Sequence, residues 1–264
     1  MAIETFLLYG LLGAGAGVLA GLFGIGGGLV IVPVLVWIFR SQGIDESIVL
    51  HLAIGSSLAT IIVTAISSMR AHHRRGSLDW QIFKRLGPGI VVGALLGAVI
   101  ANEFSTFWLQ RYVALFILLV SIQLVFELSV NPHREMPGQA GMNIAGGVIG
   151  TLSSMIGIGG GTLSVPFMVW HNLPMKKAVG TASACGLPIA IAGTIGFIFT
   201  GSSSERLPEY ATGFLYWPAV IGIAIFSYLT APIGAALAHR LPVAMLKRLF
   251  AVLLAIVGLK MLTA

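Results

Sequence analysis

Charged residues are scarce in this sequence. Only 9% of its 264 residues are Asp, Glu, Lys or Arg, whereas a soluble domain carries about 25%. Hydrophobic residues make up 57% of the chain, and its mean hydropathy is +0.97. Because a soluble fold would need far more polar surface, the composition predicts a membrane protein with several spans and argues against a soluble protein with a large core.

Cysteine and the usual catalytic motifs are also nearly missing. Cys185 is the one cysteine, which excludes an intrachain disulfide and a cysteine-based metal cluster. No HExxH motif, GxSxG elbow or carboxylate pair stands within the apolar runs. The sequence therefore predicts neither an enzyme nor a metal or cofactor site. No Lys or Arg precedes Arg40, so a cleaved secretory signal is not expected either.

The net charge of +6 comes from basic residues that lie in short clusters between apolar runs. Membrane insertion requires such positive loops on the cytoplasmic side. The basic balance thus indicates the lipid bilayer as a partner and gives no reason to expect a nucleic acid.

Ten apolar runs can be marked, five in each half of the chain. They are 3–22, 27–39, 48–69, 82–101 and 108–128, then 140–156, 160–170, 178–200, 214–238 and 245–263. A span needs roughly 20 helical residues, and the third to fifth runs of each half meet that length. The two runs around each GIGGG are shorter, which predicts a broken, re-entrant helical hairpin in each half.

The two halves repeat one another. GLFGIGGGLVIVPVL at 21–35 matches SMIGIGGGTLSVPFM at 154–168, and AIGSSLA at 53–59 matches AVGTASA at 178–184. LQRYVALFILLVS at 109–121 likewise matches LKRLFAVLLAIVG at 246–258. We predict an all-α polytopic membrane protein with a first repeat at 1–130, a linker at 131–139 and a second repeat at 140–264. Repeated apolar segments are typical of transporters.

Loop charges predict that the repeats are inverted. RAHHRRG at 70–76 is strongly basic, whereas its counterpart, GSSSERLPEYAT at 201–212, is net negative. The bias is reversed in the neighbouring loops, so the positive-inside rule assigns opposite orientations to the two halves. Both termini are then expected outside and the linker in the cytoplasm, with three full crossings and one hairpin in each half.

The repeated glycines predict an anion site without Lys or Arg. A helix that starts inside the membrane presents free N–H groups and a partial positive charge. The GK[ST] ending of a phosphate loop is missing, because Leu29-Val30 and Thr162-Leu163 follow the glycines. The alternative is close helix packing, which we expect for Gly93 and Gly97. The candidate backbone ligands are Gly26, Gly27, Gly28, Gly159, Gly160 and Gly161, and the candidate hydroxyl ligands are Ser56, Ser57, Thr162, Thr181 and Ser183.

Other polar or helix-breaking residues complete the candidate set. The hydroxyls suit a tetrahedral or pyramidal oxyanion such as a sulfonate or sulfite, although Ser and Thr also bond to carbonyls of their own helix. Pro33 and Pro166 are expected to bend or begin the helices after the glycines. His51, at a membrane edge, is a candidate for proton coupling, with an edge histidine of no special role as the alternative.

The paired GxxGIGGG…VP motifs, with AIGSSLA and AVGTASA, resemble the TauE/SafE family of sulfite exporters across essentially the whole chain. The resemblance implies a carrier in the inner membrane for a small sulfur-containing anion such as sulfite, sulfoacetate or a related organosulfonate. We expect export by alternating access, and a homodimer is left open. The competing hypotheses are a carrier for a metal cation, and a non-transporting membrane scaffold or intramembrane enzyme.

Overall fold

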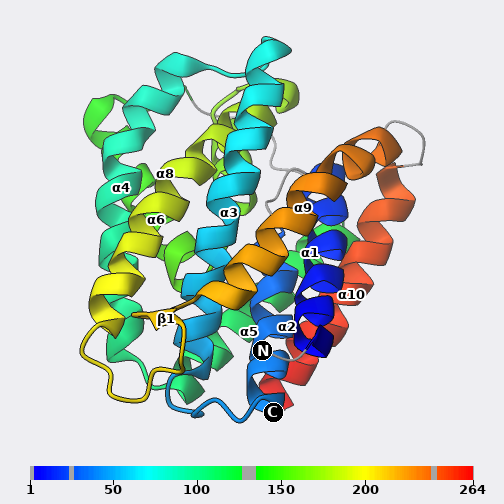
Figure 1. Ribbon diagram of the computed structural model, residues 1–264. Helices are drawn as coiled ribbons and strands as arrows, with labels where there is room; N and C mark the ends of the chain where they lie inside the picture. The colour runs from blue at the N-terminus through cyan, green and yellow to red at the C-terminus, as the bar shows by residue number, and fades with distance from the viewer. Residues whose placement is uncertain (1–2, 24–26, 127–134, 239–242, 264) are drawn as a thin grey trace.

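The computed structural model describes residues 3–23, 27–126, 135–238 and 243–263, and these form a helical bundle (Figure 1). Its helices are α1 (Ile3–Phe23), α2 (Gly28–Ser41), α3 (Val49–Arg74), α4 (Trp80–Glu103), α5 (Thr106–Val125), α6 (Gln139–Ile156), α7 (Gly161–Trp170), α8 (Met175–Gly201), α9 (Trp217–Ala238) and α10 (Val243–Thr263). Each predicted apolar run corresponds to one of them. The strands β1 (Ala211–Thr212) and β2 (Leu215–Tyr216) pair antiparallel just before α9.

Four of these helices, α3, α4, α5 and α8, are long and apolar enough to cross a membrane. This confirms the prediction of an all-α membrane protein. At 1.5 Å per residue, the 14 residues of α2 and the 10 of α7 cover only about 21 and 15 Å, less than the ~30 Å hydrocarbon core. Their partners α1 and α6 have 21 and 18 residues, or about 32 and 27 Å, so the second arm of each hairpin is the shorter one.

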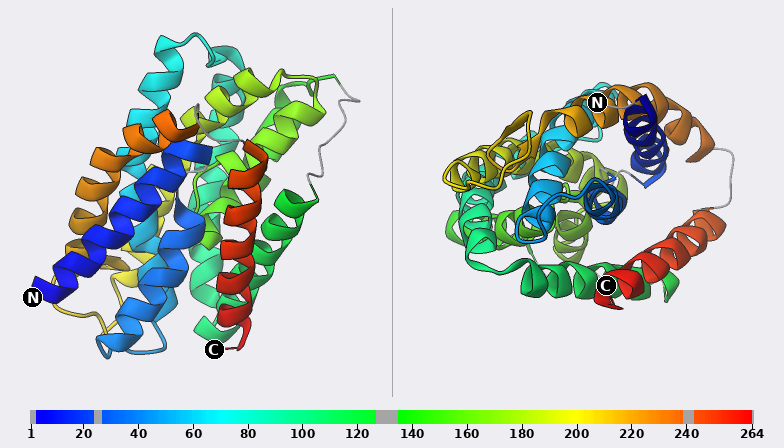
Figure 2. Two further views of the ribbon diagram at one scale, coloured as in Figure 1. Left: turned by 90° about the vertical axis from the view of Figure 1, so that its right-hand side faces the viewer. Right: turned by 60° about the horizontal axis from the view of Figure 1, so that its bottom comes forward.

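Helices of one half of the chain pack against helices of the other half. α1 lies along α9, and α4 lies along α6, so the first helix of each half contacts the fourth helix of the other. α3 packs against α8, while α5 and α10 lie together on another side of the bundle (Figure 2). The β1–β2 hairpin closes one end of the molecule beside the start of α9 (Figure 1).

Glycines allow the exchanged helices to approach closely. A Cβ atom on Gly13 of α1 would lie 2.6 Å from the carbonyl oxygen of Ile223, and one on Gly146 of α6 would lie 2.5 Å from that of Leu86. On α4, a Cβ atom at Gly93 would lie 2.1 Å from the Gly147 carbonyl oxygen. A Cβ atom at Gly97 would lie 2.5 Å from the carbonyl oxygen of Thr151. The packing role predicted for Gly93 and Gly97 is therefore confirmed.

The two ends of the bundle differ in charge. We call the end with the α3–α4 connection the basic end, and the opposite end with β1 and β2 the acidic end (Figure 1). The basic end carries Arg70, Arg74, Arg75, Lys84, Arg85, Lys176 and Lys177, along with Asp79. The acidic end carries Asp45, Glu46, Glu103, Glu205 and Glu209, along with Arg40, Arg111, Arg206 and Lys260. The beginning of α1 and the end of α10 both lie at the acidic end (Figure 2).

Candidate functional site

The two glycine motifs meet inside the bundle. A Cβ atom on Gly28, the first residue of α2, would lie 2.5 Å from the carbonyl oxygen of Gly157 and 2.9 Å from the Cα atom of Ile158. Segments 133 residues apart in the sequence therefore touch through their backbones. We call Gly27, Gly28 and residues 157–161 the glycine junction. Gly26 lies outside the described residues.

Two junction glycines have left-handed backbones that other residues rarely adopt. Gly27, with φ of 73°, is the N-cap of α2, and its carbonyl accepts from the N–H groups of Val30 and Ile31. Gly157, with φ of 75°, ends α6, where the Ile158 N–H donates to the Ser153 carbonyl at 3.0 Å. This is a glycine-terminated helix end of the Schellman type. Glycine at these positions thus stops one helix and starts another within the membrane.

The start of α7 presents unused backbone donors. Ser164 N–H donates to the carbonyl of Gly160 at 2.8 Å. The N–H groups of Gly161, Thr162 and Leu163 come before this first helical bond and take no acceptor from the part of the chain that the structure describes. A helix start of this kind attracts negative charge.

The two prolines lie within the short helices and do not begin them. Pro33 and Pro166 are each the sixth residue of their helix, because α2 starts at Gly28 and α7 at Gly161. Proline has no N–H, so the carbonyls four residues earlier, at Leu29 and Thr162, lose their helical donors. Backbone near both helix starts is therefore less completely hydrogen-bonded than in a regular helix.

Several buried hydroxyls have no partner, and those of Thr162 and Ser164 belong to the first turn of α7. The side-chain oxygens of Ser153, Thr162, Ser164 and Thr194 are buried without a hydrogen bond to any described residue. Ser153 and Ser164 are fully buried. Ser164 Oγ lies 3.3 Å from where a Cβ atom on Gly160 would stand, so it faces the start of α7. Buried polar atoms in native proteins nearly always have partners, so the hydroxyls of Thr162 and Ser164 are candidates to bind a polar ligand.

The other predicted hydroxyls bond to the protein itself. Ser57 Oγ donates to the Gly157 carbonyl at 2.8 Å and so holds the junction from α3. Ser183 Oγ donates to the Gly180 carbonyl of its own helix at 2.7 Å.

Ser56 and Thr181, which match in the repeat alignment, bind connections at opposite ends of the bundle. Ser56 Oγ accepts from the Tyr216 N–H at 3.0 Å, and Thr181 Oγ1 accepts from the Asp79 N–H at 2.9 Å. The glycine before each one is pressed against the same connection, Gly55 against Phe214 and Gly180 against Ser77. The structure thus does not bring these two hydroxyls together at the junction.

His51 also lies away from the junction. Its Nε2 atom is 3.0 Å from the Ala101 carbonyl oxygen near the end of α4, and its ring packs on Phe214 with centroids 5.2 Å apart. Nδ1 is buried and has no partner among the described residues. The structure places this imidazole at the acidic end, in contact with α4 and the β hairpin.

The sequence pattern missed part of the unpartnered set. Thr162 was predicted from the glycine motif, and Ser153 and Ser164 flank that motif. Thr194 carried no signal, because it stands alone in an apolar run. Over the described ranges, no group of three or more His, Cys, Asp or Glu side chains gathers to hold a metal ion. The donors at the junction, N–H groups and hydroxyls, are suited to an anion.

Comparison with known proteins gives a consistent result over the whole chain. The family described as Sulfite exporter TauE/SafE matches residues 9–261. A Haemophilus influenzae protein named "probable membrane transporter protein" is 37% identical over 259 residues, which cover 97% of this chain and 98% of that protein. YunE of Bacillus subtilis, with the same printed description, is 26% identical over 98% of this chain and 97% of its own length. No solved structure matches.

These relatives are named as transporters and not as enzymes, which agrees with the apolar helices described above. The family match covers nearly the full length of the chain, including both glycine motifs and the helices that hold them. The chain is therefore a multi-pass membrane transporter that belongs to the TauE/SafE family of sulfite exporters.

Proposed function

We propose that this transporter moves a small sulfur-containing oxyanion, such as sulfite, sulfoacetate or a related organosulfonate, across the inner membrane. The anion binds at the glycine junction, where it accepts from the N–H groups at the start of α7 and from the hydroxyls of Thr162 and Ser164. The observation that carries this proposal is the set of buried hydroxyls without partners beside that helix start. An oxyanion supplies the acceptors that both groups lack.

The halves of the chain act as inverted repeats in this proposal. The exchanged packing of α1 on α9 and of α6 on α4 supports it, because a two-fold axis relates such pairs. Close contacts at equivalent positions agree, since Gly13 and Gly146 stand 133 residues apart, as the two glycine motifs do. The matched pair Ser56 and Thr181 binds the equivalent connection in each half. Alternating access then exposes the junction to one side at a time.

Charge supports an orientation with the basic end in the cytoplasm and both termini outside. With this orientation, export of one negative charge across about 100 mV is favourable by about 2.3 kcal/mol. Export therefore needs no coupled ion, whereas uptake would.

Paired hydroxyl variants test the site. Thr162→Val and Ser164→Ala remove hydroxyls that have no protein partner, so stability should be kept while sulfite or sulfoacetate affinity falls about tenfold or more. Ser121→Ala is the matched control. Its hydroxyl donates to the Ala251 carbonyl between α5 and α10, so stability should fall while affinity is unchanged. Calorimetry measures the affinity, uptake into liposomes measures transport, and equilibrium unfolding measures the stability.

The same assay separates the competing functions. Unchanged affinity in both Thr162→Val and Ser164→Ala would contradict a binding site at the junction. Transport of a divalent metal cation and of no oxyanion would favour the cation carrier. A folded protein that moves neither kind of ion would favour a scaffold or intramembrane enzyme.

A further inference from the structure

The two short helices, which are equivalent in the repeats, differ sharply in burial. All residues of α2 are buried except Val34, Trp37, Arg40 and Ser41. In α7 only Gly161, Ser164 and Met168 are fully buried. A symmetric conformation would bury both helices alike, so one half of the bundle is packed more tightly than the other.

α3 shows the same asymmetry along its length. Residues 49–61, toward the acidic end, are all buried, whereas the consecutive residues 66–69 are all partly exposed. Four consecutive residues cover every face of a helix. Between the junction and the basic end, Ile61, Ala65 and Ala190 form a small cluster apart from the main core. On α8, in contrast, residues 180–186 toward the basic end are all buried, so the looser packing is confined to α7 and the last turns of α3.

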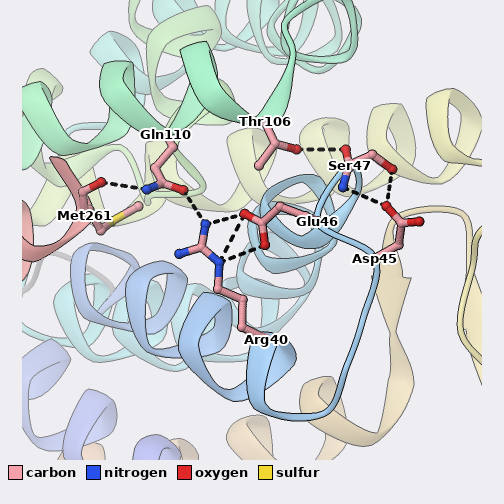
Figure 3. Close-up of polar contacts among 7 residues, drawn as sticks. All are labelled: Arg40, Asp45, Glu46, Ser47, Thr106, Gln110 and Met261. Atoms are coloured by element: carbon pink, nitrogen blue, oxygen red, sulfur yellow. Dashed lines mark hydrogen bonds and ion pairs between the residues drawn. The ribbon is translucent and has the colours of Figure 1, made fainter. Parts of the chain in front are cut away.

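A polar network ties helices together at the acidic end (Figure 3). Arg40, in the last turn of α2, donates from Nε to both carboxylate oxygens of Glu46 at 3.1 and 3.0 Å. The Arg40 guanidinium also donates to Gln110 Oε1 on α5 at 2.8 Å, and Gln110 Nε2 donates to the Met261 carbonyl of α10 at 2.6 Å. We call Arg40, Glu46, Gln110 and Met261 the acidic-end latch.

A second group of bonds supports the latch from the α2–α3 connection. Thr106 Oγ1, at the start of α5, donates to the Ser47 carbonyl at 2.8 Å. Arg206, in the connection after α8, donates to Ser47 Oγ at 3.1 Å and pairs with Asp45 at 3.4 Å. The connection between α2 and α3 is thereby held against α5 and against the connection after α8.

The repeat does not place a matching latch at the basic end. In the matched segments 109–121 and 246–258, Lys247 stands at the position of Gln110. Arg40 is the thirteenth residue of α2, whereas α7 has only 10 residues and so has no residue that corresponds to it. Neither partner of the bond between Arg40 and Gln110 is therefore repeated in the second half.

We propose that the acidic-end latch is the gate that must break before the junction, whose described residues are all buried here, opens to the acidic side. This inference rests on the proposed alternating access at the junction. The latch joins α2, which starts at the junction, to α5 and α10. Breaking it frees the end of α2 to move away from those helices, which would uncover the junction from the acidic side.

Side-specific thiol labelling tests the gate without any substrate. Thr162→Cys is introduced with Cys185→Ala, so that the junction carries the sole thiol. A charged, membrane-impermeant methanethiosulfonate is then applied to either face of oriented vesicles. With the latch intact, labelling from the acidic side is expected to be slow. Arg40→Gln and Gln110→Leu should each raise the labelling rate from the acidic side about tenfold, as loss of one partly buried, charge-assisted bond predicts.

Arg111→Gln is the matched control, because Arg111 is a cation on the same turn of α5 whose guanidinium lies over the Phe107 ring at 3.7 Å, outside the latch. Its labelling should equal that of the unchanged protein. The proposal is overturned if the acidic-side rate does not rise in either latch variant, or if Arg111→Gln raises it equally. Loss of labelling from both sides also counts against it. Since labelling requires no transport, failure of the gate and failure of sulfite binding are distinguishable.

Discussion

Substitution of Gly28 by Ala is the most direct test of contact between the two glycine motifs. The added methyl group would stand 2.5 Å from the Gly157 carbonyl oxygen, about 0.9 Å closer than the 3.4 Å at which ordinary contact begins. The obstacle is backbone, which no rotamer change can move aside. The start of α2 and the end of α6 must therefore separate.

The expected change in the free energy of unfolding of Gly28→Ala follows from two opposing effects. Overpacking of a filled interior costs about 1–3 kcal/mol, whereas replacement of glycine by alanine in a helix contributes about 1 kcal/mol of stability. Gly15→Ala isolates the second effect, because no atom lies within 4 Å of the new methyl group. Relative to Gly15→Ala, the free energy of unfolding of Gly28→Ala should be lower by about 1–3 kcal/mol.

Equilibrium unfolding in mixed micelles, followed by tryptophan fluorescence, gives this difference, and liposome transport shows its effect on function. We expect Gly28→Ala to transport poorly and Gly15→Ala to transport normally. If the two variants matched each other in both stability and transport, the packing of Gly28 on Gly157 would be refuted.

Three further predictions follow from other contacts. Ser56→Ala and Thr181→Val leave the Tyr216 or Asp79 N–H unpaired, so each should lower the free energy of unfolding by about 1–3 kcal/mol; a loss of anion affinity at unchanged stability would contradict this assignment. Bonds from the Ser47 hydroxyl and N–H, with the nearby Arg206 guanidinium, lower the pKa of Asp45. The stabilisation from its carboxylate is thus complete above the ordinary pKa of Asp and is lost as pH falls through the lowered value, and Asp45→Asn should flatten the acid limb of the stability profile. Gly27→Val strains a backbone with φ of 73° and should abolish sulfite binding, measured by calorimetry; normal affinity would argue that α2 does not begin as described.

Much of the fold is determined locally, and the sequence was sufficient for it. Hydropathy decides which segments enter the membrane, and each of the ten apolar runs became a helix. The shortness of α2 and α7 was also predictable, because glycines mark where each begins and a polar connection follows soon after. Loop charges, which act on each segment at insertion, predicted the basic and acidic ends that the bundle shows.

The partners of the hydroxyls depended on the tertiary structure. Thr181 resembled a ligand in sequence, yet its oxygen accepts from an N–H 102 residues away, and Ser56 accepts from one 160 residues away. Ser164, in contrast, lies in the first turn of α7 and meets no hydrogen-bond partner among the described residues. Periodicity and composition describe one segment at a time, so they indicate that a hydroxyl is buried without indicating what it meets. Only the packing of distant helices decided which polar groups the protein satisfies itself and which remain available to an anion.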